Sequence, residues 1–147
     1  MGPITSATTQ RANLIAELEA IGRSVSFQAG ERVITEGEPG DGVYILRSGS
    51  ARVSMTAHDG ETIQLRELGC GAFIGLSSTL SCDHSCYTVE TAEAAAFTFI
   101  PVDKACEFLR QRTDLCLQVM QVLGQEMSAV CHERAILNAR SQPVRIP

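Results

Sequence analysis

The chain has 147 residues, a size at which one hydrophobic core forms without disulfides or metals and at which a two-domain enzyme is not expected. Hydrophobic residues make up 44% and charged residues 20%, which is typical of a globular protein and not of a disordered chain. The formal charge is −5, opposite in sign to the basic surface of a domain that binds phosphate backbones, so direct nucleic-acid contact is not expected.

The first predicted element is a short helix over residues 14–22. Its apolar residues recur at helical spacing, at positions 14, 15, 18 and 21, and Glu17 and Glu19 lie opposite them. Gly22 follows at a point where a helix can end.

Residues 27–101 have the pattern of an all-β domain, with short β-rich runs separated by glycine-containing turns. The Asp59-Gly60 pair predicts a hairpin, because glycine tolerates the positive φ of a tight turn. Many short strands at regular spacing favour a sandwich or barrel over a parallel sheet. The predicted strands are Val43–Leu46, Ala51–Met55, Thr62–Leu65, Tyr87–Thr91 and Ala96–Ile100.

Two helices are predicted over residues 103–138. Asp103 can cap a short helix that ends at Leu109, and Asp114 can cap a long helix that runs to Asn138. One face of the long helix is an apolar stripe that packs either on the β domain or on the same helix of a second copy, and its length favours a homodimer. The stripe consists of Cys116, Met120, Leu123, Met127, Val130, Arg134 and Leu137, and it is widened by Leu115, Val119 and Val122. Residues 139–147 are predicted to be a flexible tail after a single domain over residues 1–138.

Several motifs together resemble those of a known family. The segment from Phe27 to Val53 reads F-x-x-G-E-x-V-I-x-E-G-E-P-G-D-G-V-Y-I-L-x-S-G-S-A-x-V, and Leu68-Gly69-x-Gly71-x-Phe73-Ile74-Gly75 follows it. This resembles the cyclic-nucleotide-binding domains of the catabolite-activator and fumarate-nitrate regulator superfamily. The resemblance covers roughly residues 14–138. It implies a mainly β fold, an eight-stranded jelly roll (double-stranded β-helix) with flanking helices and a long C-terminal dimerisation helix.

In that family the ligand is held by a phosphate-binding cassette, in which a Glu binds the ribose and an Arg and a small hydroxyl residue bind the cyclic phosphate. Here the corresponding residues are Leu76, Ser85 and Cys86, so both charged anchors are replaced. The resemblance therefore predicts weak or no binding of cyclic AMP or cyclic GMP, and no cofactor is assigned. The candidate ligand-binding residues are Phe73, Ile74, Gly75, Leu76, Ser77, Ser85, Cys86, Val130 and Cys131.

The sequence leaves the content of the pocket open. Its many hydroxyl side chains suit a neutral or weakly polar small molecule, but Leu76 and Phe73 can also fill the cavity. Cys82, His84 and Cys86 would share one face of an extended segment, which makes them a weak candidate site for a metal or a redox switch. Otherwise the six cysteines, too few for a disulfide scaffold, are expected to be reduced thiols.

The residues thus predict a stand-alone, non-catalytic sensor domain that forms homodimers and responds to an unidentified effector or protein partner. No recognised catalytic motif is present, which is why no enzyme is predicted. No apolar run approaches the ~20 residues of a membrane span and no signal peptide is recognised, so the protein is expected to be cytoplasmic. Two alternatives remain: a ligand-free dimerisation module, or the sensor half of a regulator whose helix-turn-helix domain is missing after Pro147.

Overall fold

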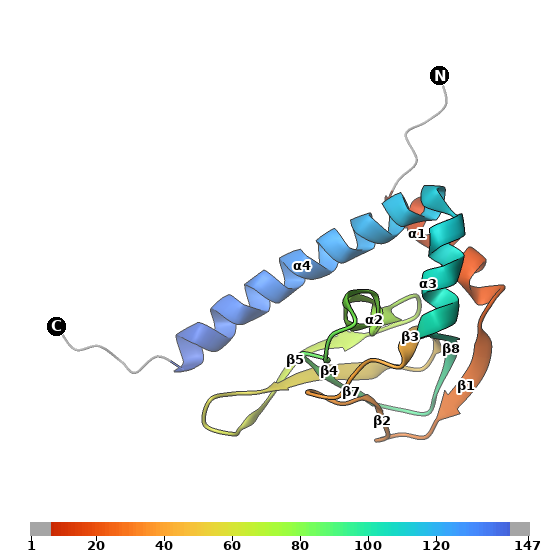
Figure 1. The fold of residues 1–147 in the computed structure, drawn as a ribbon. Helices are drawn as coiled ribbons and strands as arrows, with labels where there is room; N and C mark the ends of the chain where they lie inside the picture. Colours follow the sequence, from red (N-terminus) through yellow and green to blue (C-terminus); the bar gives the residue numbers. More distant parts are fainter. Residues whose placement is uncertain (1–6, 142–147) are drawn as a thin grey trace.

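The computed structural model describes residues 7–141, and it places two β-sheets beside four helices (Figure 1). The helices are α1 (Ala7–Glu19), α2 (Leu76–Ser81), α3 (Val102–Gln111) and α4 (Thr113–Ser141). The strands are β1 (Arg23–Phe27), β2 (Arg32–Ile34), β3 (Gly42–Ser48), β4 (Ala51–Thr56), β5 (Thr62–Leu68), β6 (Phe73–Ile74), β7 (Thr88–Thr91) and β8 (Ala95–Pro101). None of the described helices is long and apolar enough to cross a membrane.

Each sheet has four antiparallel strands, in the orders β1-β8-β3-β6 and β2-β7-β4-β5. This arrangement confirms the predicted jelly roll. All five predicted strands are present, while β1, β2 and β6 were not predicted as separate strands. The β domain also begins at Arg23, four residues before the predicted boundary at Phe27. The predicted hairpin joins β4 to β5, and Gly60 has a φ of +84° in a connection that runs from Ala57 to Glu61.

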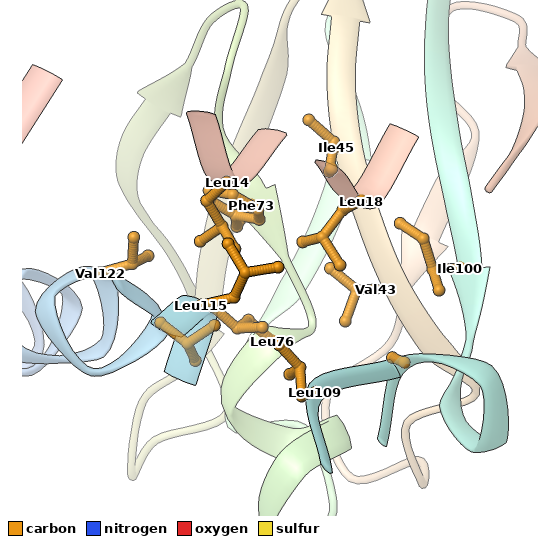
Figure 2. Packing of buried hydrophobic residues seen from close by; sticks show 12 residues of the cluster. Leu14, Leu18, Val43, Ile45, Phe73, Leu76, Ile100, Leu109, Leu115 and Val122 are labelled. Carbon is orange, nitrogen blue, oxygen red and sulfur yellow. The ribbon is translucent and has the colours of Figure 1, made fainter. Parts of the chain in front are cut away.

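Two hydrophobic cores share strand β3. Tyr44 and Leu46 point between the sheets, where they pack with a cluster that includes Phe97 and Phe99. Val43 and Ile45, on the other face of the strand, pack with the helices (Figure 2). Because both faces are covered, the central part of β3 is a continuous apolar run and does not alternate with polar residues.

The helix boundaries differ from the prediction at several points. Helix α1 begins at Ala7 and ends at Glu19, so it extends further toward the N-terminus than the predicted range 14–22. Asp103 and Asp114 lie in the first turns of α3 and α4, within the helices and not before them, where their charge still stabilises the helix dipole. Helix α4 reaches Ser141, beyond Asn138. The rest of the predicted tail, residues 142–147, lies outside the described part of the chain.

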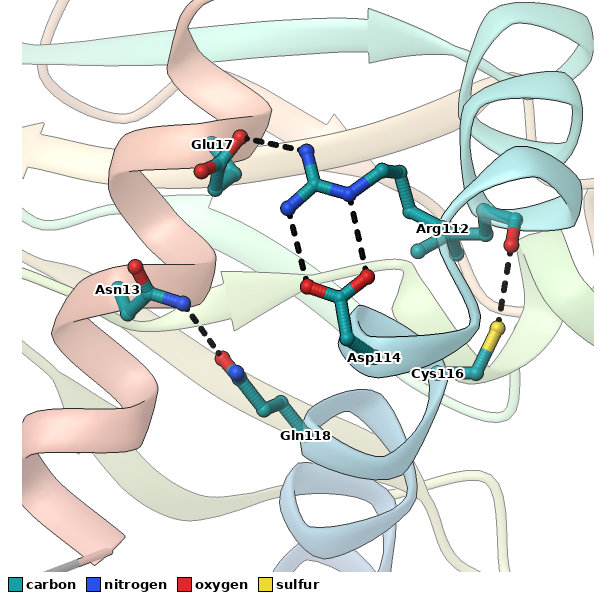
Figure 3. A network of polar contacts seen from close by, with 7 residues as sticks. Asn13, Glu17, Arg112, Asp114, Cys116 and Gln118 are labelled. Atoms are coloured by element: carbon teal, nitrogen blue, oxygen red, sulfur yellow. Dashed lines mark hydrogen bonds and ion pairs between the residues drawn. The ribbon is translucent and has the colours of Figure 1, made fainter. Parts of the chain in front are cut away.

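A polar network joins α1 to the corner between α3 and α4 (Figure 3). The Arg112 guanidinium donates to Glu17 at 3.0 Å and makes two hydrogen bonds to the Asp114 carboxylate, at 3.0 and 3.1 Å. These bonds hold the pKa of Asp114 below its ordinary value. Asn13 donates to Gln118 of α4 at 3.3 Å. The contacts fix the start of α4 against α1, and therefore the direction in which α4 leaves the β domain.

Candidate ligand pocket

A pocket of about 400 Å³ lies between α2, the loop that follows it, strands β4 and β5, and helix α4. This volume falls within the range of small-molecule sites. It is lined by Met55, Arg66, Ser77, Ser78, Ser81, Asp83, His84, Ser85, Cys86, Tyr87, Leu123, Glu126, Met127, Glu133 and Arg134.

Helix α2 is placed against β3 by contacts that require particular residues. Gly75 precedes the helix with a φ of +79°, and a Cβ at this position would lie 2.8 Å from the carbonyl oxygen of Gly42. The Thr79 hydroxyl, which is buried, donates to the same carbonyl at 2.9 Å. Leu76 then points into the core, only 2% exposed, and Ser77 lines the pocket.

The loop after α2 is tied to the turn that precedes β3. The backbone N–H of Ser85 donates to the carbonyl of Glu38 at 2.9 Å, and that of Gly37 donates to the carbonyl of Ser85 at 2.8 Å. The Ser85 hydroxyl is itself engaged, because it donates to the carbonyl of Tyr87 at 2.6 Å. Ser85 is therefore a buried, bonded wall residue of the pocket.

Two charged side chains of the pocket lining, Arg66 and Glu133, are paired with each other. Arg66 of β5 forms a hydrogen-bonded ion pair with Oε1 of Glu133 on α4, and its guanidinium lies 5.5 Å from the centre of the Tyr87 ring. The Glu133 side chain is 8% exposed. Its second oxygen, Oε2, is buried and has no hydrogen-bond partner among the described residues. Burial, followed by the charge of Glu133, raises the pKa of Tyr87 above its ordinary value.

Glu126 lies two turns before Glu133 on the same face of α4 and also lines the pocket. Burial raises its pKa from 4.5 to about 6, against the opposing charges of Arg11 and Arg66. Asp83 is an exposed third carboxylate of the lining. The described lining thus carries carboxylates on α4 and on the loop after α2, together with the paired guanidinium of Arg66 and the exposed one of Arg134.

The structure divides the predicted site residues between the pocket and the cores. Ser77, Ser85 and Cys86 line the pocket, whereas Phe73, Ile74 and Leu76 are buried in the cores and do not. The apolar side chain of Leu76 turns inward at the start of α2, so it neither fills the pocket nor takes the place of a ligand-binding Glu. Gly75 acts as the backbone cap of α2, and Cys131 is exposed outside the lining. The side chain of Val130 lies outside the described part.

Sequence reasoning missed Arg66, Glu126 and Glu133. Arg66 lies just beyond the predicted strand Thr62–Leu65, and the two glutamates occupy polar positions beside the predicted stripe of the long helix. Only their spacing of seven residues, which places them on one helix face, could have indicated a shared role.

The predicted stripe on α4 is divided between two faces of the helix. Cys116 and Leu123 pack against the core of the same chain, and the Cys116 thiol donates to the carbonyl of Leu109 (Figure 3). Met120 and Met127 are exposed, at 64% and 66%, and Arg134 is exposed at the rim of the pocket. The side chain of Leu137 is not among those described.

The segment from Cys82 to Cys86 is not an extended strand, so the alternation that would align Cys82, His84 and Cys86 on one face is absent. Cys82 ends α2 with a left-handed φ of +57°, and His84 makes an isolated β-bridge to Pro39. In the part of the chain from residue 7 to 141, no group of three metal-binding side chains is close enough to hold an ion.

Comparisons with known proteins agree with this architecture. Residues 24–112 match the family model described as cyclic nucleotide-binding domain. The chain is 26% identical over 132 residues to the CRP-like cAMP-activated global transcriptional regulator of Mycobacterium tuberculosis H37Rv. The aligned residues make up 90% of this chain but only 59% of the regulator.

Two solved structures share the fold at low identity. The catabolite activator protein of Thermus thermophilus is similar with a TM-score of 0.74 at 17% identity, over 86% of this chain and 59% of that protein. A cyclic nucleotide-binding domain from Methylobacillus flagellatus also gives 0.74, at 18% identity, over 91% of this chain and 76% of that one.

Proposed function

Since the chain belongs to the cyclic nucleotide-binding domain family, we propose that it is a non-catalytic regulatory domain whose pocket binds a small molecule other than cyclic AMP or cyclic GMP. We further propose that it acts as a homodimer through α4. Met120 and Met127, predicted as partner-helix residues, are central to that dimer.

The pairing of the charges in the pocket carries the first part of the proposal. A cyclic phosphate needs a cation, but of the two arginines in the lining Arg66 is held by Glu133 and lies over the Tyr87 ring, and Arg134 is exposed at the rim. Ser85, at the position of the family's arginine, uses its hydroxyl within its own loop. Losing a charged partner of a bound ion typically costs about 2–5 kcal/mol. Asp83 and Glu126 add negative charge on two sides of the pocket, which disfavours a phosphate further.

Isothermal titration with cyclic AMP and cyclic GMP tests this preference. We expect no saturable heat with either nucleotide up to about 1 mM. In the variant Ser85→Arg, which places a guanidinium at the pocket wall, we expect cyclic AMP to bind at least about tenfold more tightly than to the native chain.

Gln64→Arg is the matched control, because it adds the same charge on an exposed position of β5 outside the pocket lining. Circular dichroism checks that both variants fold. Micromolar binding of either nucleotide by the native chain would overturn the proposal.

Exposed residues of α4 support the dimer. Leu117, Met120 and Met127 are 60%, 64% and 66% exposed, although their apolar side chains favour burial. With Gly124 and Cys131, which are also exposed, they form a stripe at alternating spacings of three and four, typical of helix pairing. In the described part of the chain, a Cβ on Gly124 would have no atom within 4 Å apart from its neighbours and its own helix backbone, which leaves room for the close approach of a second helix. We name these five residues the outer stripe.

Helix α4 connects the two proposed activities. Its inner face supplies Leu123, Glu126 and Glu133 to the pocket, and its outer stripe is available to a second copy. Met127 lies between the two, because it belongs to the outer stripe and also lines the pocket. A ligand that contacts the inner face stabilises one position of α4. The dimer geometry that is compatible with this position then becomes more populated.

A second candidate is the sensor part of a longer transcription regulator. It is favoured by the comparison with the mycobacterial regulator, of which this chain spans 59%. The same pocket and outer stripe would then control a DNA-binding domain carried on a longer chain.

A further inference from the structure

Glu133 is an unusual wall residue because half of its carboxylate is without a partner. Oε1 binds Arg66, while Oε2 is buried and accepts no hydrogen bond from any described residue. A buried acceptor left in this state costs about 1–3 kcal/mol, and more when it is charged. A donor that reaches Oε2 would remove this cost.

The surroundings of Glu133 indicate the charge of that donor. Glu126 lies on the same face of α4, about 10 Å away along the helix axis, and Asp83 lies on the opposite wall. The other lining residues that can carry a positive charge are Arg66, which is paired, Arg134 at the exposed rim, and His84, whose side chain is 65% exposed. The buried part of the lining therefore has two carboxylates and one neutralised cation.

The rest of the lining suits an apolar stem that carries this charged group. Met55, Leu123 and Met127 supply apolar surface, and Ser77 and Ser78 supply hydroxyl oxygens that accept hydrogen bonds from N–H groups. A ligand with a cationic head and a hydrocarbon stem would be contacted along its whole length.

Resting on the proposed function of the pocket, we infer that its ligand is an organic cation, a primary amine or guanidine. Its N–H groups donate to Oε2 of Glu133, and the carboxylate of Glu126 adds a second negative charge to the same wall. The ligand class is thus opposite in charge to a cyclic nucleotide. The Arg66–Glu133 pair stays intact on binding, because the ligand uses the carboxylate oxygen that Arg66 leaves free.

Three probes with the same number of carbon atoms and different charge test the inference: hexylammonium, hexanol and hexanoate. Each is titrated up to about 20 mM into the ¹⁵N-labelled full chain near pH 7.5, and the backbone amides around the pocket are followed by NMR. We expect saturable shifts with hexylammonium, at least about tenfold weaker binding of hexanol, and none of hexanoate.

Glu133→Gln is the decisive variant, because the amide keeps the shape of the side chain and an oxygen for Arg66 but removes the charge. We expect it to weaken hexylammonium binding about tenfold. Glu67→Gln is the matched control on β5, with a side chain 65% exposed outside the lining, and should leave binding unchanged.

Two outcomes separate this inference from the function on which it rests. If hexanol or hexanoate binds at the pocket as tightly as hexylammonium, or if Glu133→Gln has no effect, the cation preference is wrong and the pocket remains a ligand site. If none of the three probes shifts the pocket amides, both the cation inference and the proposed ligand site are wrong.

Discussion

Glu126 is held in a pocket that disfavours its charged form. Because burial raises its pKa from 4.5 in the unfolded chain to about 6, the folded state binds the proton more tightly. The contribution of Glu126 to stability is therefore fully present below about pH 4.5, and it is lost as the pH rises through 6. A shift of this size corresponds to roughly 2 kcal/mol at most.

The variant Glu126→Gln removes this dependence. We expect its free energy of unfolding to exceed that of the native chain by about 1–2 kcal/mol near pH 7.5, and the difference to fall toward zero near pH 4.5. Urea denaturation at several pH values measures the difference, with Glu67→Gln as an exposed control. A difference that does not change with pH would contradict the placement of Glu126 in a desolvated wall.

At the scale of single elements, α2 shows how neighbouring residues divide between core and pocket. Leu76 is 2% exposed and packs with Leu14, Leu109 and Leu115, whereas Ser77 is exposed to the pocket (Figure 2). We expect Leu76→Ala to lower the free energy of unfolding by about 2–5 kcal/mol. Ser77→Ala should change it by less than about 0.5 kcal/mol.

Urea denaturation of the two variants checks this division. Equal and small effects would mean that Leu76 faces the pocket, as the family resemblance alone predicts. Because Leu76 is in the core, a Glu at this position would bury its carboxylate there and would not restore ribose binding.

The strands that could be predicted from the sequence are those with a continuous or alternating apolar pattern, such as β3 and β8. Strands β1, β2 and β6 have five, three and two residues, too few for a pattern to be distinguished from the adjoining turns. Their pairing, for example of Tyr44 and Ile45 with β6, depends on contacts across the chain. The resemblance to a family supplied the total of eight strands, which periodicity alone could not.

The apolar stripe predicted on α4 is divided between two faces of the helix in the structure. The sequence could not show this, because the division also depends on contacts across the chain. A spacing of three and four residues identifies which positions share a face, but it does not identify what covers that face. Leu115, Val119 and Val122 bind α4 to its own domain, and this rotates Cys116 and Leu123 inward. Only Met120 and Met127 of the predicted stripe belong to the outer stripe.

For the whole molecule, the fold and the position of the pocket could be anticipated from the glycine-rich turns and the cassette. The chemistry of the pocket could not be anticipated from the sequence. It depends on Arg66 of β5 meeting Glu133 of α4, two residues 67 positions apart in the sequence. The two walls come together because the Arg112 network and the core fix the angle of α4 (Figures 1 and 3).

In the proposed function, helix α4 serves both as a wall of the pocket and as the contact with a second copy. Sedimentation equilibrium over a range of concentrations tests it most directly. We expect the native chain to sediment at about twice its mass of 15.8 kDa, and the double variant Met120→Glu/Met127→Glu to sediment as a monomer with an unchanged circular dichroism spectrum. Gln125→Glu, which adds charge at an exposed position on another side of α4, should remain dimeric. A native chain that stays monomeric at about 100 μM, or a double variant that dimerises as well as the native chain, would contradict the account.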